Sequence, residues 1–217
     1  MVRDLPKQAR VVIIGGGIAG CSVAYHLTNL GWKDVLVLER KALTGGTTWH
    51  AAGLVTQLRN TRTLIEIAKQ AVDLYPTLEA ETGQPTGWRQ TGSITVARND
   101  GRMDELRRIT SLGRAYGIEI EPISPREAGE LFPLMQTDDL VGAIHIPKDG
   151  QTVPQDTATA LAEGAKIRGA SVFEDATVTG IRQSGGAVSG VSTDRGDVAC
   201  EIVVNCAGMW GREVGLL

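Results

Sequence analysis

The chain has 217 residues, which is enough for one large domain or two small ones with a sizeable core. Its composition, with 42% hydrophobic and 22% charged residues, is that of an ordinary globular protein. The 22 basic and 25 acidic residues are spread along the chain. This distribution indicates neither a nucleic-acid-binding patch nor a basic helix for a membrane surface.

The N-terminal region shows no pattern typical of a targeting segment. Its longest apolar run, Val11 to Ile14, is too short to span a bilayer or to form a signal segment. Residues 1–5 lack the Arg- and Ser-rich character of a transit peptide. These features predict a cytoplasmic protein without a membrane partner, or a mitochondrial matrix protein if the chain is a processed eukaryotic one.

The three cysteines, Cys21, Cys200 and Cys206, have neither metal-ligand nor C-x-x-C spacing. An odd number of cysteines fits reduced thiols better than a disulfide framework. Cys21 falls in a predicted helix and Cys206 in a predicted apolar strand. We therefore interpret both as core residues, and no metal site is predicted.

The first forty residues follow the order strand, Gly-rich turn, helix, strand. A β-branched run covers residues 10–14, helical apolar spacing covers 18–30 and ends at Gly31, and a second β-rich run covers 34–39. Two strands joined through a crossover helix form a parallel, right-handed βαβ unit. The sequence thus predicts an α/β fold of Rossmann-like type.

The rest of the chain alternates between helices and short strands. Residues 41–60 are irregular, and helices are expected at 62–81, 101–116 and 154–168. A further helix is expected to begin at Pro125, with Ser124 as its N-cap and Glu127 as the capping-box partner. Strands are expected at 92–97, 141–146, 171–173, 177–182, 188–193 and 201–205. The element order predicts a nucleotide-binding domain at 1–60 and 148–217, with an α+β insertion at 61–147. The chain stops just after a strand and a helix start, so we expect it to be a truncated piece.

The Gly-rich turn has the spacing of a dinucleotide fingerprint. Glycines at the first, third and sixth positions follow a strand and open a helix, in the run Gly15-Gly16-Gly17-Ile18-Ala19-Gly20. The first glycine allows the tight turn, the second lets the backbone approach a pyrophosphate, and the third permits close packing of helix and strand. Glu39, nineteen residues beyond Gly20, ends the second strand, where a carboxylate can accept from ribose hydroxyls and disfavours a 2′-phosphate. This pattern predicts dinucleotide binding but does not separate NAD from FAD.

The next segment carries a resemblance to a known family. After Glu39-Arg40 comes Thr44-Gly45-Gly46-Thr47-Thr48-Trp49-His50-Ala51-Ala52-Gly53-Leu54. This stretch resembles the FAD-dependent amine oxidoreductases of the D-amino-acid-oxidase-like superfamily, specifically the sarcosine and dimethylglycine dehydrogenases. Further matching pieces lie along nearly the whole chain, among them Gly87-Trp88, Asp149-Gly150 and the run from Val204 to Trp210.

The resemblance implies a set of cofactor-binding residues. In that family the histidine of the T-W-H-A-A-G segment carries FAD through the 8α-methyl group of the flavin, and here that position is His50. Val178 matches a strand residue at the adenine end, and Trp210, after Gly208, matches a flavin-side position. The implied FAD-binding set comprises Gly15, Gly17, Ile18, Ala19, Gly20, Glu39, Arg40, Gly46, Thr47, Thr48, Trp49, His50, Ala51, Ala52, Gly53, Leu54, Val178, Gly208 and Trp210.

The resemblance also implies a reaction and its partners. The family oxidises the N-methyl group of a small methylated amino acid, such as sarcosine or dimethylglycine, to an iminium. An electron-transfer flavoprotein or oxygen takes the electrons, and tetrahydrofolate can take the carbon in a C-terminal region that this sequence lacks. Residues 61–147 would then be part of the substrate domain, and no catalytic residue is assigned.

Three alternatives stay open at this point. One is an NAD-linked dehydrogenase of Rossmann type, which a bound flavin would exclude. Another is a different FAD-dependent amine oxidase, of the methylaminobutyrate type. The third is a non-catalytic regulatory relative that keeps the fold without the chemistry, although a flavin-linking His50 would have no use there.

Overall fold

The computed structural model describes residues 4–217. Residues 1–3 lie outside the described residues. They include the start of the predicted first domain and most of residues 1–5, the segment that lacks the character of a transit peptide. The chain divides into two compact units. Unit 1 comprises residues 1–52, 77–87 and 153–217, and unit 2 comprises residues 53–76 and 88–152.

The predicted βαβ motif is present at the start of unit 1. Strand β1 (Val11–Ile14) and strand β2 (Val35–Leu38) pair in parallel, with Val11 opposite Val35 and Ile14 opposite Leu38. Helix α1 (Ile18–Asn29) connects them. All residues of both strands are buried, as expected for a parallel strand that is covered on both faces.

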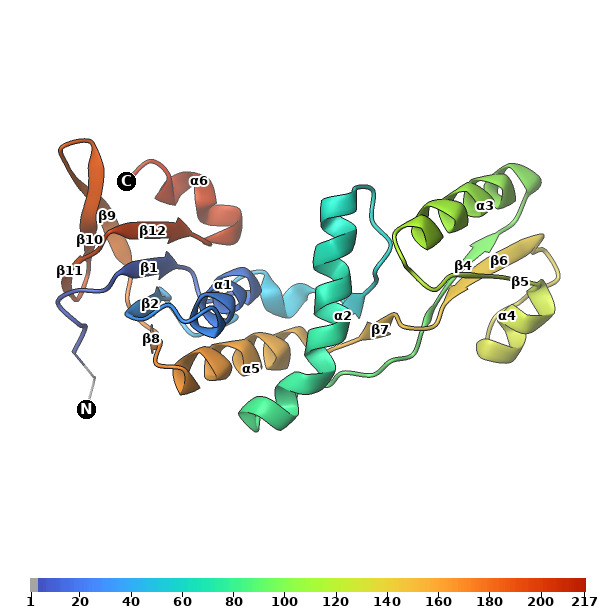
Figure 1. Cartoon of the computed structure of the whole chain (residues 1–217), viewed down its shortest axis with the longest axis horizontal. Coiled ribbons are helices and arrows are strands. Elements are labelled where there is room, and N and C mark those ends of the chain that lie inside the picture. The colour runs from blue at the N-terminus through green and yellow to red at the C-terminus, as the bar shows by residue number, and fades with distance from the viewer. Residues whose placement is uncertain (1–3) are drawn as a thin grey trace. The chain divides into compact units, whose positions relative to one another are not determined.

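Two strands from distant parts of the chain complete this sheet (Figure 1). Strand β12 (Ile202–Asn205) lies beside β1, and strand β8 (Ser171–Phe173) lies beside β2, all parallel, in the order β12-β1-β2-β8. The carboxyl ends of these strands therefore meet at one edge of the sheet. The last residues of β1, β2 and β12 at that edge are Ile14, Leu38 and Asn205.

Each face of the parallel sheet has its own core. One face packs on helix α1 and on α5 (Pro154–Ile167), with Ile13, Ala24, Val37 and Ala165 among the buried residues. The other face packs on an antiparallel sheet, β9 (Val178–Ser184), β10 (Ala187–Thr193) and β11 (Gly196–Ala199). A short η2 turn (Gly208–Trp210) and helix α6 (Gly211–Val214) follow β12.

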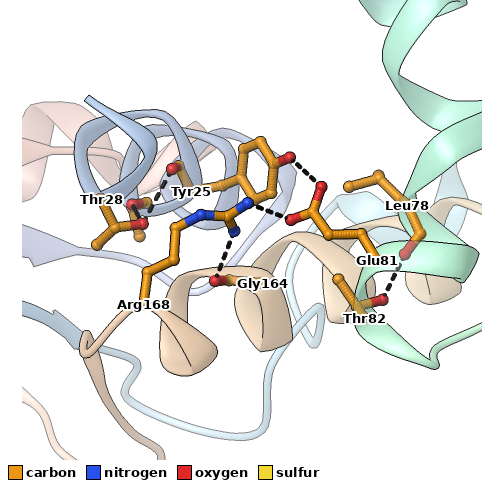
Figure 2. Close-up of polar contacts among 8 residues, drawn as sticks. Tyr25, Thr28, Leu78, Glu81, Thr82, Gly164 and Arg168 are labelled. Carbon is orange, nitrogen blue, oxygen red and sulfur yellow. Dashed lines mark hydrogen bonds and ion pairs between the residues drawn. The ribbon is translucent and has the colours of Figure 1, made fainter. Parts of the chain in front are cut away.

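A polar cluster joins three helical segments of unit 1 (Figure 2). The Tyr25 hydroxyl donates to Glu81 Oε2 over 2.8 Å, and Arg168 Nη2 donates to Glu81 Oε1 over 2.5 Å. Arg168 also donates to the Gly164 carbonyl, and its guanidinium lies 4.9 Å from the centre of the Tyr25 ring. The cluster thus ties α1 and α5 to the last turn of helix α2 (Arg62–Thr82).

Unit 2 is an α+β arrangement. Helix α2 (Arg62–Thr82) contributes its residues up to Pro76 to this unit and the later ones to unit 1. Strands β4 (Ser93–Ala97), β6 (Gly142–Ile146) and β5 (Glu121–Ile123) form an antiparallel sheet in that order, and β3 (Leu54–Val55) pairs with β7 (Gly150–Gln151). Helix α3 (Asp100–Ala115) packs on this sheet, with Leu106 of the helix and Ile144 of β6 in one buried core.

Helix α4 (Pro125–Leu131) has the predicted start. Ser124 Oγ accepts from the Glu127 N–H, and the Glu127 carboxylate accepts from the Ser124 N–H. The capping box expected from the sequence is therefore confirmed. The hydrogen bonds to Ser124 hold the pKa of Glu127 below its ordinary value.

The two units differ at their borders from the domains predicted at 1–60 with 148–217 and at 61–147. The end of α2 and the following residues to Gly87 belong to unit 1, whereas Gly53 to residue 60 and residues 148–152 belong to unit 2. The assignment of the inserted segment to substrate binding stays a prediction. Among residues 4–217, no helix combines the length and apolar character needed to cross a membrane.

Candidate functional site

The glycines of the turn after β1 are required by close backbone contacts. Gly15 has φ of +111°, and a Cβ there would lie 2.4 Å from the Cys206 carbonyl oxygen. A Cβ on Gly20 would lie 1.9 Å from the Gly15 carbonyl oxygen. Both distances are far inside van der Waals contact, so the turn packs against β12 and α1 only without side chains at these positions.

The first turn of α1 directly follows the Gly-rich turn. The N-cap residue of α1, Gly17, has no side chain to cap the helix, and the Ile18 N–H instead donates to Thr48 Oγ1 over 3.0 Å. The helix N-terminus carries the positive end of the helix dipole and N–H groups without partners inside the helix. Such an end favours a phosphate.

The Glu39 carboxylate lies at the end of β2 and is partly buried. Its Oε2 accepts from the Gly16 N–H over 2.7 Å, and its Oε1 accepts from the Lys41 N–H over 2.9 Å. A carboxylate has about four acceptor positions, so each oxygen keeps capacity for another donor. Glu39 therefore fixes the Gly-rich turn and can still accept from ribose hydroxyls.

The loop after β2 folds back on the turn. The Thr44 N–H donates to the Gly16 carbonyl over 3.0 Å. A Cβ on Gly46 would lie 3.3 Å from the Trp210 ring, and the Arg40 guanidinium lies 4.0 Å from the centre of that ring. Trp210 is thus held between the loop and a cation–π contact.

These segments surround one pocket with a volume of about 490 Å³. This volume is within the usual range for small-molecule and cofactor sites. The pocket lining includes many of the residues predicted to bind the cofactor, namely Gly15, Gly17, Glu39, Arg40, Gly46, Thr47, Thr48, Val178, Gly208 and Trp210.

The remaining predicted residues lie away from the pocket lining. Ile18, Ala19 and Gly20 are in the first turn of α1, where Ile18 contributes its N–H and Gly20 its close packing. Trp49 and His50 belong to the η1 turn (Thr48–His50), are exposed, and place their ring centres 3.8 Å apart. Ala51 and Ala52 are exposed and follow that turn, whereas Gly53 and Leu54 belong to unit 2.

Sequence reasoning missed other lining residues, namely Ile14, Leu38, Lys41, Gly45, Ala176, Thr177, Cys206, Ala207, Glu213, Val214 and Leu217. Cys206 and Ala207 directly follow β12, and the position of β12 beside β1 brings them to the Gly-rich turn. The rule that ligands bind beyond the carboxyl ends of parallel strands could have indicated them. Cys206 is only half-buried and lies just after the strand in which it was predicted.

The thiols near the pocket, Cys21 and Cys206, are poor nucleophiles. Burial, and next the Glu39 carboxylate, raises the pKa of Cys21 to about 12. Burial also raises the pKa of Cys206. Both thiols therefore stay protonated at neutral pH. Within the described part of the chain, no group of three or more His, Cys, Asp and Glu side chains could hold a metal ion.

The parallel sheet, the glycine turn and the carboxylate after β2 define a dinucleotide-binding α/β protein. Residues 10–217 match the family described as DAO, FAD dependent oxidoreductase. The chain belongs to this family of FAD-dependent oxidoreductases, and the predicted fold class and family are confirmed.

Similar proteins include enzymes and a regulatory subunit. The chain is 47% identical over 98% of its length to the human mitochondrial sarcosine dehydrogenase, and 43% identical over 98% to the mouse mitochondrial pyruvate dehydrogenase phosphatase regulatory subunit. The crystal structure of L-proline dehydrogenase from P. horikoshii superposes with a TM-score of 0.92, at 29% identity over 98% of this chain. The chain spans 24% of the length of the two curated relatives and 56% of the solved chain.

Proposed function

We propose that the pocket binds FAD and that this chain forms the FAD-binding part of an enzyme that oxidises the N-methyl group of sarcosine or dimethylglycine. The observation that carries this proposal is the convergence of the glycine turn, Glu39 and the Gly45–Thr48 loop on one pocket, in a chain of the FAD-dependent oxidoreductase family. The similarity to sarcosine dehydrogenase supports the substrate class.

The residues of the pocket fit the chemistry of FAD. The start of α1 and the bare backbone at Gly15 and Gly17 suit the pyrophosphate. The free acceptor positions of Glu39 suit ribose hydroxyls. When bound, FAD would supply a two-electron acceptor for the amine. The chain itself would bind and orient the cofactor.

We further propose that His50 is the residue to which FAD is covalently attached. His50 lies two residues beyond Thr48, which lines the pocket, and its imidazole is on the exposed η1 turn. A neutral imidazole nitrogen is a competent nucleophile. Joining it to the 8α-methyl carbon would break one N–H and one C–H bond and release two protons and two electrons, which oxygen would take up as hydrogen peroxide. Two glycines, Gly45 and Gly46, give conformational freedom to the backbone that precedes His50.

In the whole protein the substrate amine would be oxidised to an iminium at its N-methyl carbon. An electron-transfer flavoprotein or oxygen would receive the electrons, and formaldehyde or a tetrahydrofolate adduct would carry the carbon. The mitochondrial relatives favour the matrix over the cytoplasm if the chain comes from a eukaryote. The experiment that tests this proposal compares sarcosine, dimethylglycine and a methylaminobutyrate as substrates.

One observation favours a second candidate function, which is a regulatory subunit without oxidase chemistry. The similarity to the pyruvate dehydrogenase phosphatase regulatory subunit is nearly as high as that to sarcosine dehydrogenase. The two candidates differ in whether the protein turns over a methylated amine and in whether a flavin is linked to His50.

The test uses the protein expressed from its own full gene. Wild-type protein should give a yellow pellet after acid precipitation, and a tryptic peptide containing His50 should carry the mass of FAD. His50→Ala should bind FAD but release it into the supernatant. Sarcosine or dimethylglycine should bleach the wild-type flavin and yield formaldehyde. A colourless protein that is inert to both amines, and to methylaminobutyrate, would support the regulatory candidate.

A further inference from the structure

Thr48 connects two elements that are thirty residues apart in the sequence. Its side-chain oxygen accepts the Ile18 N–H over 3.0 Å, at the very start of α1. Its backbone begins the η1 turn, in which the Ala51 N–H donates to the Thr48 carbonyl over 3.2 Å. Thr48 is only 7% exposed, and its hydrogen bond with Ile18 is partly buried beside the pocket that Thr48 lines.

The cap at α1 has to come from elsewhere because Gly17 occupies the N-cap position. A Cβ on Gly17 would lie 3.1 Å from Thr48 Oγ1, a tight contact that would press on the hydroxyl bonded to the Ile18 N–H. A helix N-terminus without a side-chain cap leaves its first N–H groups without acceptors. Thr48 therefore supplies from the loop an acceptor for the first N–H of α1, whereas an N-cap Ser or Asp accepts from the second or third.

We propose that Thr48 is a positioning residue that couples the start of α1 to the turn carrying His50. The inference rests on the proposed function, in which α1 binds the pyrophosphate of FAD and His50 carries the flavin. The Thr48–Ile18 hydrogen bond fixes the beginning of η1 against the phosphate-binding helix. Helix α5 contacts η1 as well, so the turn is held from two directions.

The coupling makes the position of His50 depend on one hydroxyl group. Thr48→Val keeps the shape of the side chain but removes the acceptor, whereas Thr48→Ser keeps the acceptor and removes the methyl group. Without the acceptor the partly buried Ile18 N–H loses its hydrogen-bond partner, and η1 loses the link to α1 that Thr48 makes. Small displacements of a reacting group slow bond formation strongly.

The experiment compares three variants in the full protein, prepared without flavin and then supplied with FAD. Thr48→Val should raise amide hydrogen exchange at Ile18 about three- to tenfold. It should also slow the formation of acid-stable protein-bound flavin on the order of ten- to a hundredfold. Thr48→Ser should keep both properties. Thr159→Val is the matched control, because the Thr159 hydroxyl makes one hydrogen bond on the exposed surface of α5 and should change neither.

The outcomes separate this inference from the proposed function. Normal flavin linkage in Thr48→Val would overturn the coupling even if Ile18 exchange increases, because Thr48 would then be only a helix cap. Failure of Thr48→Ser to restore linkage would overturn it too, since the hydroxyl would not be the active group. Wild-type protein that binds FAD without linking it to His50 would overturn both the coupling and the covalent attachment. Wild-type protein that binds no FAD would overturn the proposed function itself.

Discussion

Replacing Gly20 with alanine should destabilise unit 1 although alanine is the better helix former. A Cβ at this position would lie 1.9 Å from the Gly15 carbonyl oxygen, where ordinary contact begins at about 3.5 Å. The obstacle is backbone, so no side-chain rotation relieves it. Gly15 is itself closely packed, because a Cβ there would lie 2.4 Å from the Cys206 carbonyl oxygen.

The magnitude follows from two opposing effects. Overpacking of this kind costs about 1–3 kcal/mol, and a contact with fixed backbone belongs at the upper end. The higher helix propensity of alanine returns at most about 1 kcal/mol. We expect a net loss of about 2 kcal/mol in the free energy of unfolding. With a urea m-value of about 2 kcal/mol/M, the unfolding midpoint should fall by about 1 M. The shift of Gly15 should also weaken FAD binding.

The assay is urea unfolding followed by fluorescence, with FAD titration on folded proteins that all carry His50→Ala, so that the cofactor binds reversibly. Gly101→Ala is the matched control, since Gly101 is also a helical glycine and its added Cβ would lie 3.6 Å from Asn99 Oδ1. That variant should be as stable as the wild type or up to about 1 kcal/mol more stable. A Gly20→Ala protein with wild-type stability and FAD affinity would refute the packing argument.

Three further predictions follow from the polar groups of unit 1. Glu39→Gln removes the charge that accepts from two backbone N–H groups, and in the His50→Ala background it should weaken FAD binding by about 1.5–3 kcal/mol in fluorescence titration; unchanged affinity would mean that Glu39 only ends a strand. The raised pKa of Cys21, about 12 when folded against 9.0 for the free thiol, means that the unfolded state loses its proton first as pH rises. Stability should therefore fall between pH 9 and pH 12, and Cys21→Ala should remove this part of the slope in pH-dependent unfolding. Glu81→Gln should lower the free energy of unfolding by about 0.5–1.5 kcal/mol, since the Arg168 pair is partly exposed; no change in thermal unfolding would show that the cluster adds nothing.

The first half of the fold was predictable because its signals are local. Apolar runs of four residues, the glycine spacing and the helical period of residues 18–29 all act within one βαβ unit. The capping box at Ser124 is local as well, and the helix begins where it was predicted. Helix and strand bounds differ from the predictions by one or two residues, which is the usual fraying of element ends.

The elements that were missed depend on partners far away in the sequence. Strands β3 and β7 have two residues each, and only their pairing with one another makes them strands. Strand β11 contains Gly196 and Asp197, which are poor strand formers, and is held by its register with β10. The irregular segment predicted at 41–60 contains η1, whose position depends on a hydrogen bond to Ile18. The hydrophobic period of a segment and the secondary-structure propensities of its residues carry no information about such contacts.

The site follows the same division between local and distant contributions. The glycine turn and Glu39 could be found from one motif, because they are the loops after two adjacent strands of one βαβ unit. The wall formed by Cys206 and Ala207 needs the sheet order, since β12 lies beside β1 only after the intervening chain has folded. The central strand β1 thus has a binding loop on each side, and neither neighbour can be removed without opening the pocket. Substitutions in the strands should therefore change stability first, whereas substitutions in the loops at their carboxyl ends should change cofactor binding first.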